Sequence, residues 1–290
     1  MSGRQVAACH RQRIEAETRA YVERTGRRPC LAVVLVGNDP ASISYVTSKR
    51  KACEEMGFEH RDYELDGATS EADLLALISR LNGDDDVDGI LVQFPTPAQI
   101  DDDKVVLAID PAKDVDGLHP VNAGLALMGR EGFVSCTPKG ILALLDYYGI
   151  ATDGRRVCII GRSNLVGKPL AALLMQKGRD ATVTVCNTHT RNLGAITRES
   201  DIIIVAAGHV DTLGADMVSE GAVVIDVGTN RVEDSSRERG WRLVGDCDYD
   251  EVCRKASFIT PVPGGVGPMT ITMLMDNTLI AARRRSGERI

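Results

Sequence analysis

The sequence predicts an α/β protein with two domains, one of them built on a doubly wound parallel sheet. Short apolar runs rich in β-branched residues alternate with helical patterns along most of the chain. One run, residues 157–160, is apolar on both faces, which is typical of a parallel strand covered by helices on each side. The chain has 290 residues, 43% of them apolar, which is enough for two ordinary hydrophobic cores.

The strands and helices follow from the same patterns. Helices are expected at residues 5–24, 42–56 and about 269–284. Strands are expected to end at Val36, Phe94, Ile160, Val185, Val205, Val227 and Ile259.

The clearest break in the chain lies at residues 136–140. There Thr137 can cap a helix, and Pro138 suits its first position. We therefore expect one domain to comprise residues 1–138 with 268–290, and the other to comprise residues 139–267.

Charge and composition exclude several classes of partner. The formal charge is -7, and binding to a phosphate backbone rests on clustered Lys and Arg, so we expect no nucleic acid. The apolar runs fall far short of the roughly 20 residues that a membrane span needs, so we expect no membrane. The amino-terminal segment lacks the apolar stretch of a secretory signal. The eight cysteines show no metal-ligand or C-x-x-C spacing, which favours free thiols in the cytosol.

A glycine-bearing turn follows residues 157–160 and leads into a helical pattern. Gly161 permits a tight turn, and Gly167 lets helix and strand approach closely. The start of such a helix favours an anionic pyrophosphate. The spacing departs from G-x-G-x-x-G, so a glycine turn without any nucleotide is the alternative. Ser163 is not a nucleophile, because G-x-S-x-G requires glycine where Leu165 stands.

The segment after the next predicted strand indicates which nicotinamide cofactor would bind. An NAD site commonly has an Asp or Glu there for the ribose hydroxyl, whereas the 2′-phosphate of NADP calls for cations. Residues 187–191 read Asn-Thr-His-Thr-Arg, without a carboxylate, which favours NADP. The candidates for the phosphate are Arg162 and Thr188, with His189 and Arg191 as helpers, and each of them alone is equally compatible with a solvent-facing loop.

A second candidate site lies on the helix predicted at residues 42–56. Tyr45 and Lys49 are four residues apart and share one helix face, where a ring can hold a flat ligand while an amine moves protons. A lysine does so near neutral pH only if burial or other cations depress its pKa, and an ordinary surface lysine is the alternative. Gln93 favours a site, because it ends an apolar strand, where open α/β sheets place ligands, and a neutral amide can hydrogen-bond the lysine.

Two loops complete the set of candidates. Asp114 and Asp116 flank Val115, and an ionised carboxylate there can accept two hydrogen bonds from an amino-pyrimidine edge, although carboxylates two residues apart also occur in ordinary turns. Residues 260–270 hold three glycines and three prolines, which indicates either a rigid loop with its backbone open to a ligand or an interdomain turn.

Taken together, these stretches resemble the bifunctional methylenetetrahydrofolate dehydrogenase/methenyltetrahydrofolate cyclohydrolase family. The match begins near Gly3 and keeps the family's order through YVTSK, GILVQFPTP, KDVDGLHPVNAG, CTPKG, GRSNLVGKP, IDVGTN, GDCDYDEV and ITPVPGGVGPMT. The resemblance implies a folate-binding catalytic domain at residues 1–138 with 268–290 and a Rossmann-like NADP-binding domain at residues 139–267. Because the match begins so near Met1, we expect no transit peptide, and the family's usual first short strand is missing.

The family resemblance also implies an activity and the residues that serve it. The enzyme would oxidise 5,10-methylenetetrahydrofolate with NADP and hydrolyse the product to 10-formyltetrahydrofolate, as a cytoplasmic homodimer without a metal. Lys49 would be the catalytic lysine, with Tyr45 holding the aromatic part of folate, Gln93 tuning the lysine and Asp116 gripping the pterin. The folate site would also be lined by Val92, Phe94, Pro263, Gly264, Gly265, Val266 and Gly267. The cofactor would meet Gly161, Arg162, Ser163, Thr188 and Thr229.

The sequence departs from the family pattern at several positions. Asn187 and Thr188 stand where His and Ser are usual, VQFPTP replaces VQLPLP, and Thr229 replaces an isoleucine. Thr188 keeps a hydroxyl for the phosphate, whereas the change at Asn187 leaves the cofactor preference open. The alternatives are a dehydrogenase that lacks useful cyclohydrolase activity or prefers NAD, and a non-catalytic nucleotide or folate sensor. A sensor would tolerate the loss of Lys49, Gln93 or Asp116, and all three are present.

Overall fold

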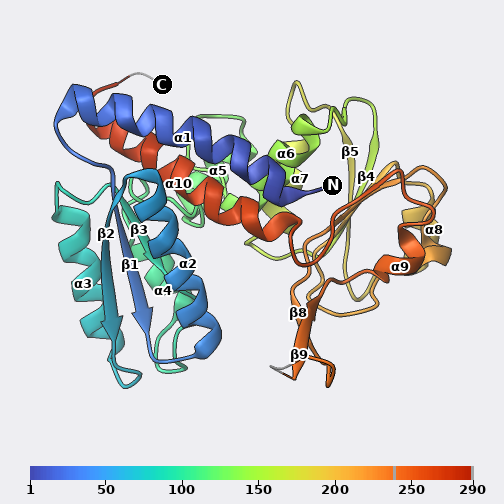
Figure 1. Cartoon of the computed structure of the whole chain (residues 1–290), viewed down its shortest axis with the longest axis horizontal. Coiled ribbons are helices and arrows are strands. Elements are labelled where there is room, and N and C mark those ends of the chain that lie inside the picture. Colours follow the sequence, from blue (N-terminus) through green and yellow to red (C-terminus); the bar gives the residue numbers. More distant parts are fainter. Residues whose placement is uncertain (238–239, 289–290) are drawn as a thin grey trace. The chain divides into compact units, whose positions relative to one another are not determined.

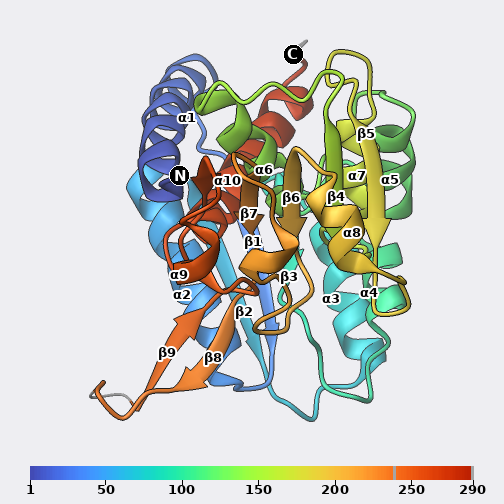
Figure 2. The ribbon, with the colours of Figure 1, turned by 90° about the vertical axis from the view of Figure 1, so that its right-hand side faces the viewer.

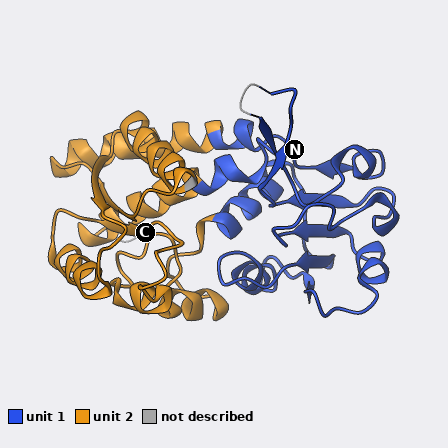
Figure 3. Cartoon of the chain, turned by 90° about the horizontal axis from the view of Figure 1, so that it is seen from below, with its two compact units in different colours: residues 1–7, 137–270 blue, residues 8–136, 271–290 orange. Residues whose placement is uncertain are grey.

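The computed structural model describes residues 1–237 and 240–288 and divides the chain into two compact units (Figure 3). Unit 1 holds residues 1–7 and 137–270, and unit 2 holds residues 8–136 and 271–290. The predicted boundaries, at residues 138/139 and 267/268, lie within three residues of these. The prediction differs for residues 1–7, which it assigned to the same domain as residues 8–136.

The sheet of unit 2 has three parallel strands in the order β2-β1-β3. The central strand β1 (Cys30–Val36) is buried over all seven residues, as expected for a strand covered on both faces. β3 (Gly89–Val92) is also buried and ends two residues before the predicted Phe94. β2 (Glu59–Leu65) was not predicted, because its sequence EHRDYEL has no apolar run. This strand order places a topological switch point, where ligands commonly bind, between the carboxyl ends of β1 and β3.

Helices surround this sheet or connect its strands. They are α1 (Gly3–Thr25), α2 (Pro40–Met56), α3 (Glu71–Gly83), α4 (Asp102–Ala108), α5 (Pro120–Leu127) and α10 (Val266–Arg285). α2 begins two residues before the predicted start at residue 42, because the Asp39 side chain accepts the Ser42 N–H and Pro40 suits the first turn. Within unit 2, α1 and α10 lie side by side (Figure 1), joined by an ion pair of 2.6 Å between Arg13 and Asp276.

The sheet of unit 1 has five parallel strands in the order β10-β7-β6-β4-β5. The strands are β4 (Arg156–Ile160), β5 (Thr182–Cys186), β6 (Ile202–Val205), β7 (Val223–Asp226) and β10 (Phe258–Ile259). The neighbouring strands β7, β6, β4 and β5 can be followed side by side in Figure 2. β4 lies between β5 and β6, so the connections run outward from it in both directions, as predicted for a doubly wound sheet. The switch point therefore lies between the carboxyl ends of β4 and β6.

The remaining elements of unit 1 include a hairpin that was not predicted. The strands β8 (Asn230–Glu233) and β9 (Trp241–Val244) pair antiparallel. Polar residues interrupt the apolar ones in both strands, so no long apolar run marks them in the sequence. The helices are α6 (Cys136–Tyr147), α7 (Gly167–Leu174), α8 (Leu193–Arg198), α9 (Tyr249–Val252) and the 3-10 helix η1 (Ala215–Met217). α6 begins at Cys136, ahead of the Thr137 cap expected from the sequence.

All eight cysteines are free thiols, and six of them are buried. Within the described residues, no helix is long and apolar enough to span a membrane.

Candidate active site

In unit 2 the structure brings Lys49 and Gln93 together. Lys49 lies on α2, and Gln93 directly follows β3. Nζ of Lys49 donates a hydrogen bond of 2.7 Å to Oε1 of Gln93. The amide nitrogen of Gln93 donates to the carbonyl oxygen of Phe94 at 2.8 Å, and its backbone N–H donates to Val34. These contacts fix the orientation of the amide, so that its oxygen faces the lysine.

The neutral form of the Lys49 amine is more favoured in the protein than it would be in water. Its side chain is half-buried. Loss of hydration lowers the pKa of Lys49 below its ordinary value, while the charges of Asp116 and Cys136 act in the opposite direction. The sequence alone could not show this shift, because it arises from burial of the amine.

The two neighbouring aspartates have different environments. Asp114 is buried, and its carboxylate accepts hydrogen bonds from the backbone of Leu118 and His119 and from the side chain of Asn122, at 2.8 to 3.2 Å. Burial raises the pKa of Asp114, and these donors act against that effect. Asp114 therefore holds the loop together. Asp116 is half-buried, and its charge, rather than that of Asp114, raises the pKa of Lys49.

The other residues expected around Lys49 differ in exposure. Tyr45 lies one helical turn before Lys49, and 49% of its surface is exposed, which leaves its ring open to a ligand. The side chain of Val92 is buried in the core of unit 2, and that of Phe94 is partly buried against the same core. The lining role expected for Val92 and Phe94 stays a prediction.

The glycine-rich segment after β10 belongs to unit 1. Its first part is a tight loop, in which Gly264 has a φ of 110° and accepts a hydrogen bond of 3.2 Å from the backbone of Arg4. A Cβ atom on Gly265 would lie 2.6 Å from the carbonyl oxygen of Pro261. Val266 and Gly267 are not loop residues, because α10 already begins at Val266. The assignment of Pro263 and the following residues to a folate site stays a prediction.

The turn after β4 has the close approach that its two glycines predict. Gly161 has a φ of 126°, which only glycine adopts readily, and a Cβ atom there would lie 2.2 Å from the carbonyl oxygen of Ala206. A Cβ atom on Gly167 would lie 2.1 Å from the carbonyl oxygen of Gly161. Both glycines are thus required for α7 to start directly beside the end of β4.

The polar candidates for cofactor binding lie on loops that follow three strands of the unit 1 sheet. Arg162 and Ser163 follow β4, Thr188 follows β5 and Thr229 follows β7, and all four are exposed. The hydroxyl of Ser163 accepts a hydrogen bond of 3.1 Å from the backbone of Val166. Because carboxyl ends of parallel strands share one edge of a sheet, these loops lie on the edge where doubly wound folds bind ligands.

Two buried aspartates that the sequence analysis did not assign hold these loops. Asp226 accepts from the backbone N–H groups of Gly228, Asp246 and Cys247, each at 2.9 Å. Asp246 accepts from the backbone of Ala207 and Gly208 and from the side chain of Asn230, at 2.7 to 2.8 Å. Gly228 and Gly245 have no room for a Cβ atom beside these carboxylates. Each aspartate has a glycine within two residues, in the stretches IDVGTN and GDCDYDEV. This pattern could have identified both of them from the sequence.

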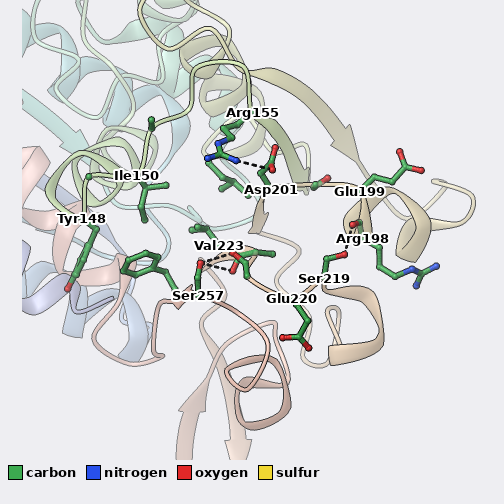
Figure 4. A pocket seen from close by; sticks show the side chains of 17 residues that line it. Tyr148, Ile150, Arg155, Arg198, Glu199, Asp201, Ser219, Glu220, Val223 and Ser257 are labelled. Carbon is green, nitrogen blue, oxygen red and sulfur yellow. Dashed lines mark hydrogen bonds and ion pairs between the residues drawn. The ribbon is translucent and has the colours of Figure 1, made fainter.

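A cavity of about 470 Å³ lies at the amino-terminal edge of the unit 1 sheet, opposite the edge that carries these loops (Figure 4). Ile202, Val223 and Phe258, which begin three of the strands, contribute to its lining, and Arg155 pairs with Asp201 across 3.3 Å. None of the site residues expected from the sequence lines this cavity. The cavity is therefore separate from the loops that the glycine turn brings together.

Comparison with known proteins assigns a family to both parts of the chain. Residues 1–116 match the catalytic domain of tetrahydrofolate dehydrogenase/cyclohydrolase, and residues 135–286 match the NAD(P)-binding domain of the same family. The bifunctional protein FolD of Chlorobium phaeobacteroides is 53% identical, over 96% of this chain and 95% of the relative.

Solved structures give the same result. The bifunctional enzyme FolD, methylenetetrahydrofolate dehydrogenase/cyclohydrolase, of Campylobacter jejuni is 47% identical, with a TM-score of 0.92 over 98% of each chain. The methylenetetrahydrofolate dehydrogenase-cyclohydrolase of Trypanosoma brucei, solved with NADP cofactor and an inhibitor, is 39% identical. Its TM-score is 0.93 over 98% of this chain and 97% of that one.

Proposed function

Because this chain belongs to the tetrahydrofolate dehydrogenase/cyclohydrolase family, we propose that it oxidises 5,10-methylenetetrahydrofolate with NADP and hydrolyses the product. The product of oxidation is 5,10-methenyltetrahydrofolate, and hydrolysis converts it to 10-formyltetrahydrofolate. The observation that carries the proposal is the half-buried Lys49, whose amine donates to the fixed amide oxygen of Gln93.

The first reaction demands positioning more than a strong base. The methylene carbon lies between two nitrogens, so loss of a hydride leaves a cation that both nitrogens stabilise. The residues proposed to hold the substrate are Tyr45, whose exposed ring can stack on the flat part of folate, and Asp116, whose carboxylate can accept from the amino-pyrimidine edge. NADP, when bound, supplies the hydride acceptor.

The second reaction needs a group that moves protons. Water adds to the cationic carbon and loses a proton. The bond from that carbon to N5 then breaks as N5 is protonated, and the hydroxyl loses its proton to solvent as the formyl group forms. An amine whose pKa is lowered by burial can accept the first proton and return it, which is the role proposed for Lys49. Gln93 accepts a hydrogen bond from the amine without adding a charge, so the amine can lose its proton.

The loops at the carboxyl edge of the unit 1 sheet fit NADP. Gly161 and Gly167 let the end of β4 lie directly beside the start of α7, where a pyrophosphate is favoured. No carboxylate follows β5 through Arg191, so the 2′-phosphate meets no repulsion there. We propose that Arg162, Ser163, Thr188 and Thr229 contact the cofactor, with Arg162 and Thr188 at the phosphate.

We further propose that the protein is a cytosolic homodimer and that the segment from Pro263 to Gly267 contributes to the folate site. The resemblance of the whole chain to bifunctional FolD proteins supports both statements. Size-exclusion chromatography with light scattering would test the dimer.

An absorbance assay with 5,10-methylenetetrahydrofolate and either NADP or NAD would test the proposed function. Reduced cofactor and the methenyl intermediate are followed separately. We expect reduction of NADP with little methenyl build-up. Build-up of the methenyl compound would indicate a dehydrogenase alone, and faster reduction of NAD would overturn the cofactor assignment. No reduction with either cofactor would favour a non-catalytic sensor.

A further inference from the structure

The turn that carries Asp116 is held by a side chain distant in the sequence. Asn277 lies in α10, and only 1% of its surface is exposed. Its amide nitrogen donates to the carbonyl oxygen of Val115 at 2.8 Å and to that of Val134 at 3.0 Å. One buried amide therefore joins the residue before Asp116 to the segment that leads into α6.

Other contacts leave this turn little room to shift. The thiol of Cys136 donates to the same carbonyl oxygen of Val115, at 3.4 Å, and lies 3.7 Å from the amide nitrogen of Asn277. Gly117 has a φ of 71°, and a Cβ atom on it would lie 2.6 Å from the backbone nitrogen of Ser135. The turn and the segment 134–136 thus pack backbone against backbone, with the Asn277 amide as a hydrogen-bonding bridge between them.

Two residues beside this bridge, Asp116 and Cys136, also affect the pKa of Lys49. Asp116 and Cys136 raise the pKa of Lys49 against the effect of burial. Asp116 directly follows Val115, and Cys136 shares the carbonyl of Val115 with Asn277. The energy between two charges depends on their separation, so a displaced turn changes the interaction between Asp116 and Lys49.

We propose that Asn277 is a positioning residue of the folate site, which holds the turn at Val115 so that the Asp116 carboxylate keeps its place relative to the amine of Lys49. The inference rests on the proposed function and deepens it, since it assigns to α10 a part in substrate binding and in proton transfer. Asn277 acts through Asp116 and has no direct part in the reaction.

Asn277→Ala tests this role, with Thr278→Val as the matched control. Thr278 is fully buried in the next position of α10 and donates to Leu274, so its replacement removes a buried hydrogen bond without touching the Asp116 turn. We expect Asn277→Ala to raise the KM for 5,10-methylenetetrahydrofolate about tenfold or more, with little change in the KM for NADP. The midpoint of the pH profile for hydrolysis should move to lower pH, because Asp116 then supports the charge of Lys49 less well. Thr278→Val should leave both quantities unchanged.

The outcomes separate this inference from the proposed function. Wild-type protein without activity on either folate would overturn the proposed function itself. With active wild-type protein, an Asn277→Ala variant that matches Thr278→Val in the KM for folate and in the pH midpoint would show that Asn277 positions nothing. Asn277→Ser, which keeps a small polar group, is measured alongside by circular dichroism and kinetics. If neither Asn277 variant folds, Asn277 supports the whole of unit 2, and the assigned role is wrong.

Discussion

Gly167 lies so close to Gly161 that a Cβ atom on Gly167 would stand 2.1 Å from the carbonyl oxygen of Gly161. Replacement by alanine must therefore push the start of α7 away from the end of β4. We expect Gly167→Ala to raise the KM for NADP about tenfold or more and to lower the free energy of unfolding by about 1–3 kcal/mol. Initial-rate kinetics and urea unfolding would measure the two effects.

Gly124→Ala is the matched control for that variant. Gly124 lies within α5, and a Cβ atom there would meet no atom within 4 Å. The substitution should leave the KM for NADP unchanged and stabilise the helix slightly. Equal cofactor kinetics in the two variants would contradict a phosphate-binding role for the turn after β4.

Lys49→Met should abolish most of the hydrolysis of 5,10-methenyltetrahydrofolate. Loss of a positioned proton-transfer group typically costs about 10²- to 10⁴-fold in rate. NADP binding, measured by calorimetry, should remain. Lys51→Met is the control, because Lys51 lies on the same helix with 75% of its side chain exposed. Hydrolysis that survives in Lys49→Met would remove this lysine from the mechanism.

The pH dependence of hydrolysis should report the pKa of Lys49. Burial lowers this pKa from its ordinary 10.5, so the neutral amine forms at a lower pH than in free lysine. The rate should rise with pH through that value and then level off. Asp116→Asn removes a charge that raises the pKa, so its midpoint should lie at lower pH than in the wild type. The comparison uses kcat/KM for hydrolysis after subtraction of the rate without enzyme, and a midpoint that moved upward would contradict the assignment.

Arg162→Ala should discriminate between the two nicotinamide cofactors. If the guanidinium meets the 2′-phosphate, its loss should raise the KM for NADP about tenfold or more and change that for NAD far less. Arg156→Ala provides the control, because Arg156 lies at the opposite end of β4 and pairs with Glu199. An equal rise for both cofactors would exclude a contact with the 2′-phosphate.

Most of the strands that could be predicted have a continuous apolar run; β5, with the sequence TVTVC, is an exception. β1, β4 and β6 are buried over nearly their whole length, and each was expected from its β-branched residues. β2 and the pair β8–β9 were missed, because their many polar residues leave no continuous hydrophobic run in the sequence. The start of α6 was expected too late, since Thr137 and Pro138 look like a cap and a first position although the helix already includes Cys136.

Part of the candidate site could be predicted because its residues lie in local patterns. Tyr45 and Lys49 share a helix face, and Gln93 ends a strand. Asn277 could not be found in this way, because its amide donates hydrogen bonds to backbone carbonyl groups distant in the sequence. The lowered pKa of Lys49 likewise depends on burial, which no spacing of residues reveals.

The charged edge of the unit 2 sheet has a consequence for self-association. β2 is an outer strand, and its sequence includes Glu59, Arg61, Asp62 and Glu64. An outer strand offers unpaired backbone groups to any other strand that approaches, and charged side chains make such pairing costly. The charged residues of β2 therefore have two effects. They leave no apolar run from which the strand could be predicted, and they protect the folded protein against edge-to-edge aggregation.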